Sequence, residues 1–285
     1  MPNTTSQSQI SVRKGDLERW LGVSAGNGTN VNTGLAGLLA LVITTLFFAC
    51  LYFAPENAFR ASLMERGPTQ YAAVLFGFWC AVILIIKRQK LKLQRRALQF
   101  QIISTSHDFV LSSQTADEVV RQIHQIAEDP ERFIVFNRIL IAISNLKNLG
   151  RVSDVDEILQ SIGERDESAQ QTSFATLSGF LWAIPVLGFI GTVLGLASSI
   201  GKFSELLDQQ SDVSGIIGSL KDVTAGLSTA FETTLVALLI ALGVQLWVTT
   251  QRKAEEMFLD DCSEYCLKQI VSRIKILPYE QSREI

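Results

Sequence analysis

The sequence predicts an all-α integral membrane protein with four transmembrane helices and a helical cytoplasmic domain. Hydrophobic residues make up 47% of the 285 residues, and the mean hydropathy is positive, at +0.25. The charged residues, 19% of the chain, are concentrated between long apolar blocks, which argues against one soluble core. No segment has the alternating pattern of a β-strand. These three observations together favour helices that cross a membrane.

Four apolar segments are long enough to span a bilayer, which requires about 17 to 25 residues. We expect transmembrane helices at residues 34–54, 69–86, 174–200 and 224–249. The first of them follows a polar stretch, residues 1–33, and no clear small-residue cleavage site comes after it. A cleaved signal peptide is therefore not expected.

The distribution of lysine and arginine predicts that both termini are cytoplasmic. The basic run Lys87-Arg-Gln-Lys-Leu-Lys-Leu-Gln-Arg-Arg96 follows the second span directly, and Arg252 and Lys253 follow the fourth. The segments 55–70 and 201–223 have no positive excess. The expected parts outside the membrane are a cytoplasmic N-terminal segment (1–33), a cytoplasmic helical domain (87–173), a periplasmic loop (201–223) and a cytoplasmic C-terminal helix (250–285).

Helix signals recur within residues 87–173. The basic run is expected to continue the second spanning helix, and Thr115-x-x-Glu118 has the pattern of a capping box. Asp129-Pro130 is expected to begin another helix, which ends at Leu149-Gly150. Ser153 is expected to cap a third helix through Leu159. Charged residues of this domain are expected on a solvated face: Glu131, Arg132, Arg138 and Arg151.

The C-terminal segment has apolar residues at helical spacing. Its stripe consists of Leu259, Cys262, Cys266, Ile270, Ile274 and Leu277, and Pro278 is expected to end the helix. The two cysteines are interpreted as small apolar residues in a helix seam, with redox sensing as the alternative. The four cysteines and two histidines of the chain lack the spacing of a metal site, so no metal and no cofactor are expected.

Small residues line one face of the third span. At ~100° per residue, the face contains Gly188, Gly191, Thr192, Gly195 and Ser199. Gly191-x-x-x-Gly195 is a small-xxx-small ridge that lets another helix approach closely. Pro185 is expected to kink or locally open this helix. Ordinary helix packing is the alternative interpretation of these residues.

The fourth span carries an acidic residue, Glu232. A carboxylate in a spanning helix costs roughly 2.5 to 3.5 kcal/mol on insertion scales, so it is expected to have a function. Ser228, Thr229, Glu232 and Thr233 share an arc of about 140°, and Thr234 lies outside it. An alternative structural role is a hydrogen bond from a hydroxyl to Glu232 that holds subunits in register.

The motif Pro185-Val-Leu-Gly-Phe-Ile-Gly-Thr-Val-Leu-Gly195, followed by Gly226-Leu-Ser-Thr-Ala-Phe-Glu-Thr-Thr234, resembles the MotA/TolQ/ExbB proton channel family. The resemblance covers roughly residues 130–270. Thr192 and Thr234 match the two threonines of the family motifs. Thr229 stands where the transporter branch has a glutamate, and Glu232 resembles a branch that carries Phe-Asp-Thr-Thr at this point.

The resemblance implies a homopentamer around two copies of a single-span partner of the MotB/TolR/ExbD kind, in the inner membrane of a bacterium. The partner supplies an aspartate that takes up and releases the ion. We expect an ion-conducting motor subunit with Glu232, Thr192, Thr229, Thr233 and Thr234 along the ion pathway. Flagellar rotation, envelope energy transduction and phage defence all remain open, as does the choice between proton and sodium.

Two other classes of function fit the sequence less well. A passive membrane scaffold, whose glycine ridges only assemble helices, is the main alternative. An enzyme is not expected, because the chain has no Ser/His/Asp set, P-loop or metal cluster. The net charge of −3 does not suggest a nucleic-acid partner.

Overall fold

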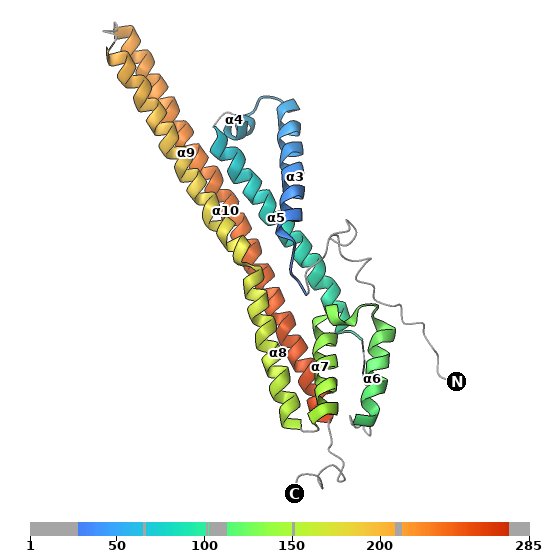
Figure 1. The fold of residues 1–285 in the computed structure, drawn as a ribbon. Coiled ribbons are helices and arrows are strands. Elements are labelled where there is room, and N and C mark those ends of the chain that lie inside the picture. The colour runs from blue at the N-terminus through green and yellow to red at the C-terminus, as the bar shows by residue number, and fades with distance from the viewer. Residues whose placement is uncertain are drawn as a thin grey trace. The chain divides into compact units, whose positions relative to one another are not determined.

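In a computed structural model, all regular elements of the described residues are helical, which confirms the all-α class for this part of the chain (Figure 1). The structure describes residues 28–64, 67–100, 102, 113–149, 152–208 and 213–273. The chain divides into two compact units. Unit 1 comprises residues 1–32, 85–173 and 251–285, and unit 2 comprises residues 33–84 and 174–250.

Unit 2 contains the apolar helices. They are α3 (Thr33–Phe53), the short α4 (Ala58–Met64), the first part of α5 (Pro68–Ala97), α9 (Ala175–Asp208) and the first part of α10 (Val213–Gln269). Four helices of the described chain are long and apolar enough to cross a membrane, as the sequence predicts.

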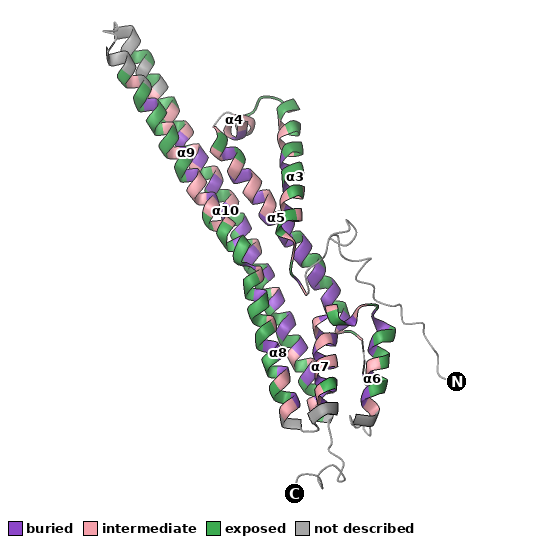
Figure 2. Ribbon diagram, viewed as in Figure 1, coloured by how far each residue is buried: buried purple, intermediate pink, exposed green. Residues whose placement is uncertain are grey.

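Many residues of these helices are exposed (Figure 2), and large apolar side chains are among them. They include Leu38 and Phe53 on α3, Trp182 on α9, and Phe231 and Leu246 on α10. Contiguous apolar surface of this kind is unfavourable in water. It is the surface expected of helices that are surrounded by lipid or by further subunits.

Aromatic side chains attach α5 to its neighbours in unit 2. The Trp79 indole N–H donates to the Thr33 carbonyl over 3.1 Å, and a Cβ on Gly37 would lie 2.5 Å from the Trp79 ring. Phe76 stacks on Phe180 of α9, with ring centroids 5.0 Å apart. A side chain larger than hydrogen at Gly37 would therefore displace the tryptophan that joins α3 to α5.

Unit 1 is a helical domain with its own apolar core. It contains the end of α5, α6 (Ser113–Ile126), a 3-10 turn η1 (Pro130–Arg132), α7 (Ile134–Leu149), α8 (Val152–Ser173), the end of α10 and η2 (Val271–Arg273). Large side chains from α6, α7, α10 and the turn before α7 are fully buried in this core, among them Ile123, Phe133, Phe136, Ile139 and Phe258.

The helix predicted to start at Pro130 begins later. Pro130–Arg132 form a 3-10 turn, Asp129 makes no side-chain capping bond, and α7 starts at Ile134. The reason is a cap from another helix: the Gln94 side chain of α5 accepts from the Ile134 N–H over 3.0 Å and donates to the Arg132 carbonyl over 2.8 Å. A tertiary contact thus replaces the local capping signal.

Two other predicted helix boundaries are wrong. The helix predicted to end at Leu159 continues to Ser173, and α6 begins at Ser113, so Thr115 lies inside it and is no N-cap. The predicted loop 201–223 is largely helical, because α9 continues to Asp208 and α10 begins at Val213. Hydropathy marks where an apolar stretch ends, whereas a helix can continue into polar sequence with its backbone bonds intact.

The C-terminal stripe is buried where it is described. Leu259, Cys262, Cys266 and Ile270 all lie in the core of unit 1, as the spacing predicts. Ile274, Leu277, Pro278 and Arg151 lie outside the described residues.

The expectation of a solvated face is wrong for Arg138. Its side chain is buried, and its Nε donates to Asp166 Oδ2 over 2.8 Å while Nη1 donates to Ser263 Oγ over 2.8 Å. The burial of Arg138 is not predicted from the sequence because its partners Asp166 and Ser263 lie far from it along the chain. These partners compensate the charge, which would otherwise be costly to bury.

Candidate functional site

The glycine face of α9 packs against α10 of the same chain. A Cβ on Gly188 would lie 2.6 Å from Ala237 Cβ, and one on Gly195 would lie 3.2 Å from Ala230 Cβ. Further along, a Cβ on Gly226 of α10 would lie 1.7 Å from Ser199 Oγ. The two helices keep one antiparallel register through these contacts. The small residues therefore let α9 and α10 approach closely.

A third helix reaches the same seam. A Cβ on Gly191 would lie 2.7 Å from Thr69 Oγ1 of α5 and 3.0 Å from Thr233 Oγ1 of α10. Thr233 is buried, and its hydroxyl donates to the Ala230 carbonyl over 2.8 Å. Hydroxyls from two other helices thus lie against Gly191, where a larger side chain would collide with both.

Two threonines bridge α9 and α10 at this seam. The Thr192 and Thr234 hydroxyls are hydrogen-bonded to each other. Thr234 Oγ1 also lies 3.0 Å from the Gly188 carbonyl, and Thr192 Oγ1 lies 3.1 Å from the Ala230 carbonyl. We call Thr192, Thr233 and Thr234 the hydroxyl cluster. It offers a group of oxygen atoms inside an otherwise apolar helix pair, where water or an ion can be coordinated.

Glu232 belongs to another face of α10. Its Oε1 accepts from the Ser228 hydroxyl over 3.3 Å, one turn earlier on the same helix, and its side chain is half-buried. At 3.6 residues per turn, Glu232 and Thr234 point about 200° apart around the helix axis. Thr229 lies on the Glu232 side of α10 and donates to the Ala225 carbonyl over 3.0 Å. Thr192 and Thr234 thus bond across the seam, whereas the bonds from Thr233 to Ala230, from Thr229 to Ala225 and from Ser228 to Glu232 join residues of α10 itself.

Pro185 lies inside α9, one turn before Gly188. The helix runs without interruption from Ala175 to Asp208, so the predicted local opening is not observed. A proline lacks the N–H that the helical ladder uses, and its ring crowds the carbonyl of the residue four positions earlier, which favours a kink. A kink of α9 at Pro185 stays a prediction.

Two polar residues near the start of α5 are missed by the sequence reasoning as site residues. Thr69 contacts the Gly191 position, and Gln70 is buried, with no hydrogen-bond partner for its Nε2 among the described residues. The available signal is their polarity at the edge of an apolar span. The sequence alone treats them only as an extension of that span.

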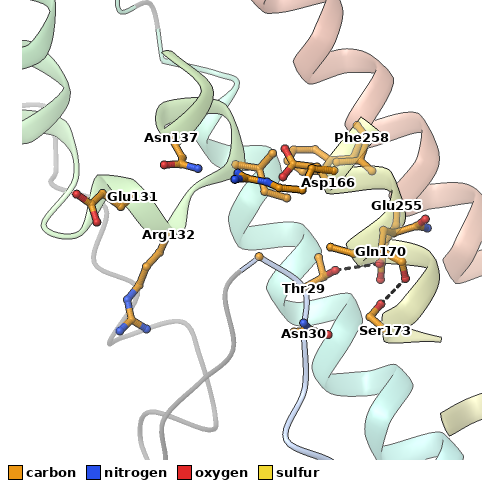
Figure 3. Close-up of a pocket in the computed structure, with 15 residues that line it drawn as sticks. Thr29, Asn30, Glu131, Arg132, Asn137, Asp166, Gln170, Ser173, Glu255 and Phe258 are labelled. Atoms are coloured by element: carbon orange, nitrogen blue, oxygen red, sulfur yellow. Dashed lines mark hydrogen bonds between the residues drawn. The ribbon is translucent and has the colours of Figure 1, made fainter. Parts of the chain in front are cut away.

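A second polar region lies in unit 1. A cavity of about 340 Å³ is lined by residues of the Gly28–Asn30 segment, η1, α7, α8 and α10. Figure 3 shows Thr29, Gln170, Ser173 and Glu255 together at one side of it. The Gln170 side chain is buried, and its Nε2 has no partner in the described part of the chain. The described residues contain no group of three or more His, Cys, Asp or Glu that could hold a metal ion.

Part of the chain matches a known protein family. Residues 128–258 match the family described as the MotA/TolQ/ExbB proton channel family. The matched segment contains α7, α8, α9 and the part of α10 that carries Glu232 and the hydroxyl cluster. No curated protein and no solved structure matches the chain.

Proposed function

Because the chain belongs to the MotA/TolQ/ExbB proton channel family, a family of ion-driven motor-type membrane subunits, we propose that it is the ion-conducting subunit of such a motor. The ion that we favour is the proton. The observation that carries the proposal is the hydroxyl cluster, which places three oxygen-bearing side chains at the contact of two apolar helices. Polar side chains that face the interior of a helix bundle within spanning segments often mark ion pathways, and this supports a role of the cluster in ion passage.

The proposed pathway uses two faces of α10. Glu232 presents a carboxylate on the half-buried face, where an aspartate of a partner helix would exchange ions with it. The hydroxyl cluster orders water, or replaces part of an ion's hydration shell, on the face of α10 that packs against α9. Thr229 and Ser228 extend the polar surface around Glu232 by one turn.

The proposed assembly is a homopentamer around a dimer of a single-span MotB/ExbD/TolR-like protein. The family supports this stoichiometry, and the exposed apolar side chains of α9 and α10 supply surface for neighbouring subunits, the partner and lipid. The glycine ridge packs within the chain, so the contacts between subunits would use those exposed faces. The proposed location is the bacterial inner membrane, with both termini and unit 1 in the cytoplasm.

The test is ion flux through the chain and its partner in liposomes, with Glu232→Gln and Thr234→Val as variants. Both changes keep the size of the side chain, and the first removes the charge. We expect each to lower the flux by about tenfold or more, equivalent to about 1.4 kcal/mol on the barrier. A pH-sensitive dye and a sodium-sensitive dye, used in parallel, identify the ion.

Thr250→Val is the matched control. Thr250 lies exposed on the same helix, and its hydroxyl donates to the Leu246 carbonyl one turn earlier over 2.9 Å. Its loss should leave the flux unchanged. If Glu232→Gln assembles with the partner and conducts at the wild-type rate, Glu232 is structural and the proposed pathway fails.

A further inference from the structure

A buried ion pair joins α5 to α10 in unit 1. Lys87 Nζ lies 3.1 Å from Glu255 Oε2, and the two side chains are 0% and 1% exposed. Glu255 also accepts from the Thr29 hydroxyl over 2.9 Å and from Gln251 Nε2 over 3.0 Å. Lys87 donates in addition to Ser173 Oγ over 2.8 Å. The pair is therefore the centre of a network that includes two helices, the end of a third and the segment before α3.

The members of this network lie where the chain passes between the two units. The passages are at residues 32/33, 84/85, 173/174 and 250/251. Thr29 precedes the first passage by three residues, and Lys87 is the third residue after the second. Ser173 is the last residue before the third passage, and Gln251 is the first after the fourth. Each of the four passages thus contributes one side chain to the network of Lys87 and Glu255.

Stability alone is a weak reason for such a pair. Removing two charges from water costs much of what their attraction returns, and apolar replacements are often as stable. Fixing one arrangement of the surrounding segments is the better-attested use of buried charges. Lys90 adds a second connection by donating to the Asn30 carbonyl.

We propose that Lys87 and Glu255 are positioning residues of the motor, and that they make the four entering segments of unit 1 move together. This inference rests on the proposed function. The helices α5 and α10 are continuous through their passages, so a displacement of either apolar part is carried along the helix to the pair. The pair passes the displacement of one helix to the other and, through Ser173, to the end of α8.

The test uses the full chain with its single-span partner in liposomes. The variants are Lys87→Met, Glu255→Gln and the charge exchange Lys87→Glu with Glu255→Lys. Lys87→Met leaves the other five basic residues of the run 87–96 in place, so the signal for orientation is kept. Native mass spectrometry counts assembled complexes, and ion flux is expressed per assembled complex.

The matched control is another buried ion pair of unit 1. Arg138 and Asp166 are 2% and 17% exposed, and their contact involves none of the four passages. Arg138→Met should lower the thermal unfolding temperature and leave the flux per complex unchanged. Lys87→Met and Glu255→Gln should each lower that flux by about fivefold or more, and the charge exchange should restore it to within about twofold.

Hydrogen exchange of the chain without its partner tests whether the entering segments of unit 1 are coupled, and it needs no ion flux. In Lys87→Met, amides near residues 85–90, 170–173 and 251–256 should exchange faster together, while in Arg138→Met they should not. Unchanged flux per complex in both single variants, or an equal loss in Arg138→Met, overturns the inference. If the wild-type chain conducts no ion, the proposed function fails, and hydrogen exchange alone tests whether the entering segments are coupled. Faster exchange confined to α5 in Lys87→Met overturns the coupling. Faster exchange in all three regions supports it.

Discussion

The effect of burial on a single side chain is clearest at the two cysteines of the C-terminal stripe. Cys262 and Cys266 lie in the core of unit 1, well beyond the fourth apolar segment. Burial raises the pKa of the Cys266 thiol to about 11 and raises the pKa of Cys262 as well. The thiolate is the reactive form of cysteine, so both residues should behave as small apolar groups. This supports the interpretation as a helix seam over redox sensing.

We predict that Cys266 resists alkylation at pH 8 in the folded protein. With a pKa of about 11, only about one thiol in a thousand is ionised at that pH. The rate should rise with pH toward the pKa, and urea should expose both cysteines. Mass spectrometry of peptides after N-ethylmaleimide treatment measures this.

A Met257→Cys variant serves as the control for that measurement, because Met257 lies exposed on the same helix. Its new thiol should react rapidly under the same conditions. Equal alkylation rates at positions 257 and 266 would refute the buried seam.

At the scale of elements, the position of α9 against α10 depends on residues without side chains. Gly188 and Gly195 face alanines of α10, and Gly226 of α10 faces Ser199. With no Cβ in the way, the two helices come close enough for Thr192 and Thr234 to bond. The hydroxyl cluster is therefore a consequence of the glycine spacing, and both should be lost together.

We predict that Gly188→Leu destabilises the chain and separates the cluster. The new Cβ would lie 2.6 Å from Ala237 Cβ and 3.2 Å from the Thr234 Cα, and a backbone atom cannot move aside by a rotamer change. Overpacking of this kind costs typically about 1 to 3 kcal/mol. Thermal unfolding in detergent, followed by circular dichroism, measures the loss.

Gly243→Leu is the control for this prediction. Gly243 lies in the same apolar part of α10, and a Cβ there would meet nothing within 4 Å. The prediction fails if both variants unfold at the same temperature. Gly191→Leu should act like Gly188→Leu, because Thr69 and Thr233 surround that position within the chain.

At the scale of the whole molecule, the basic residues carry the argument for orientation. The run 87–96 follows the second apolar segment, while the segments between the first and second spans and between the third and fourth have no positive excess. The proposed topology therefore has four spans, with both termini and unit 1 on the cytoplasmic side. Two basic residues of unit 1, Lys87 and Arg138, are buried in its interior, so they contribute to its packing in addition to the positive charge of this side.

We predict that cysteine probes report this topology in intact cells. In a Cys50→Ser background, an impermeant maleimide should label Ser62→Cys and Gln209→Cys from outside. Val110→Cys and Lys275→Cys should be labelled only after the membrane is opened. Labelling of Val110→Cys from outside would overturn the orientation.

The sequence by itself determines the features that depend on local pattern. Apolar length and helical spacing predict four membrane-capable helices and the buried stripe of Leu259, Cys262, Cys266 and Ile270. The order of two motifs on adjacent spans predicts the family that residues 128–258 match. These signals are carried by neighbouring residues, whose periodicity is a property of the chain alone.

The tertiary structure decides what depends on residues far apart in the sequence. Gln94 caps α7 and so sets where that helix begins. Asp166 and Ser263 bind the buried guanidinium of Arg138. Thr69 of α5 lies against Gly191 at the seam of α9 and α10. The same holds for Lys87 and Glu255, which sequence spacing gives no reason to pair. A basic or polar side chain looks solvated until its partner is known, because only a specific partner compensates the cost of its burial.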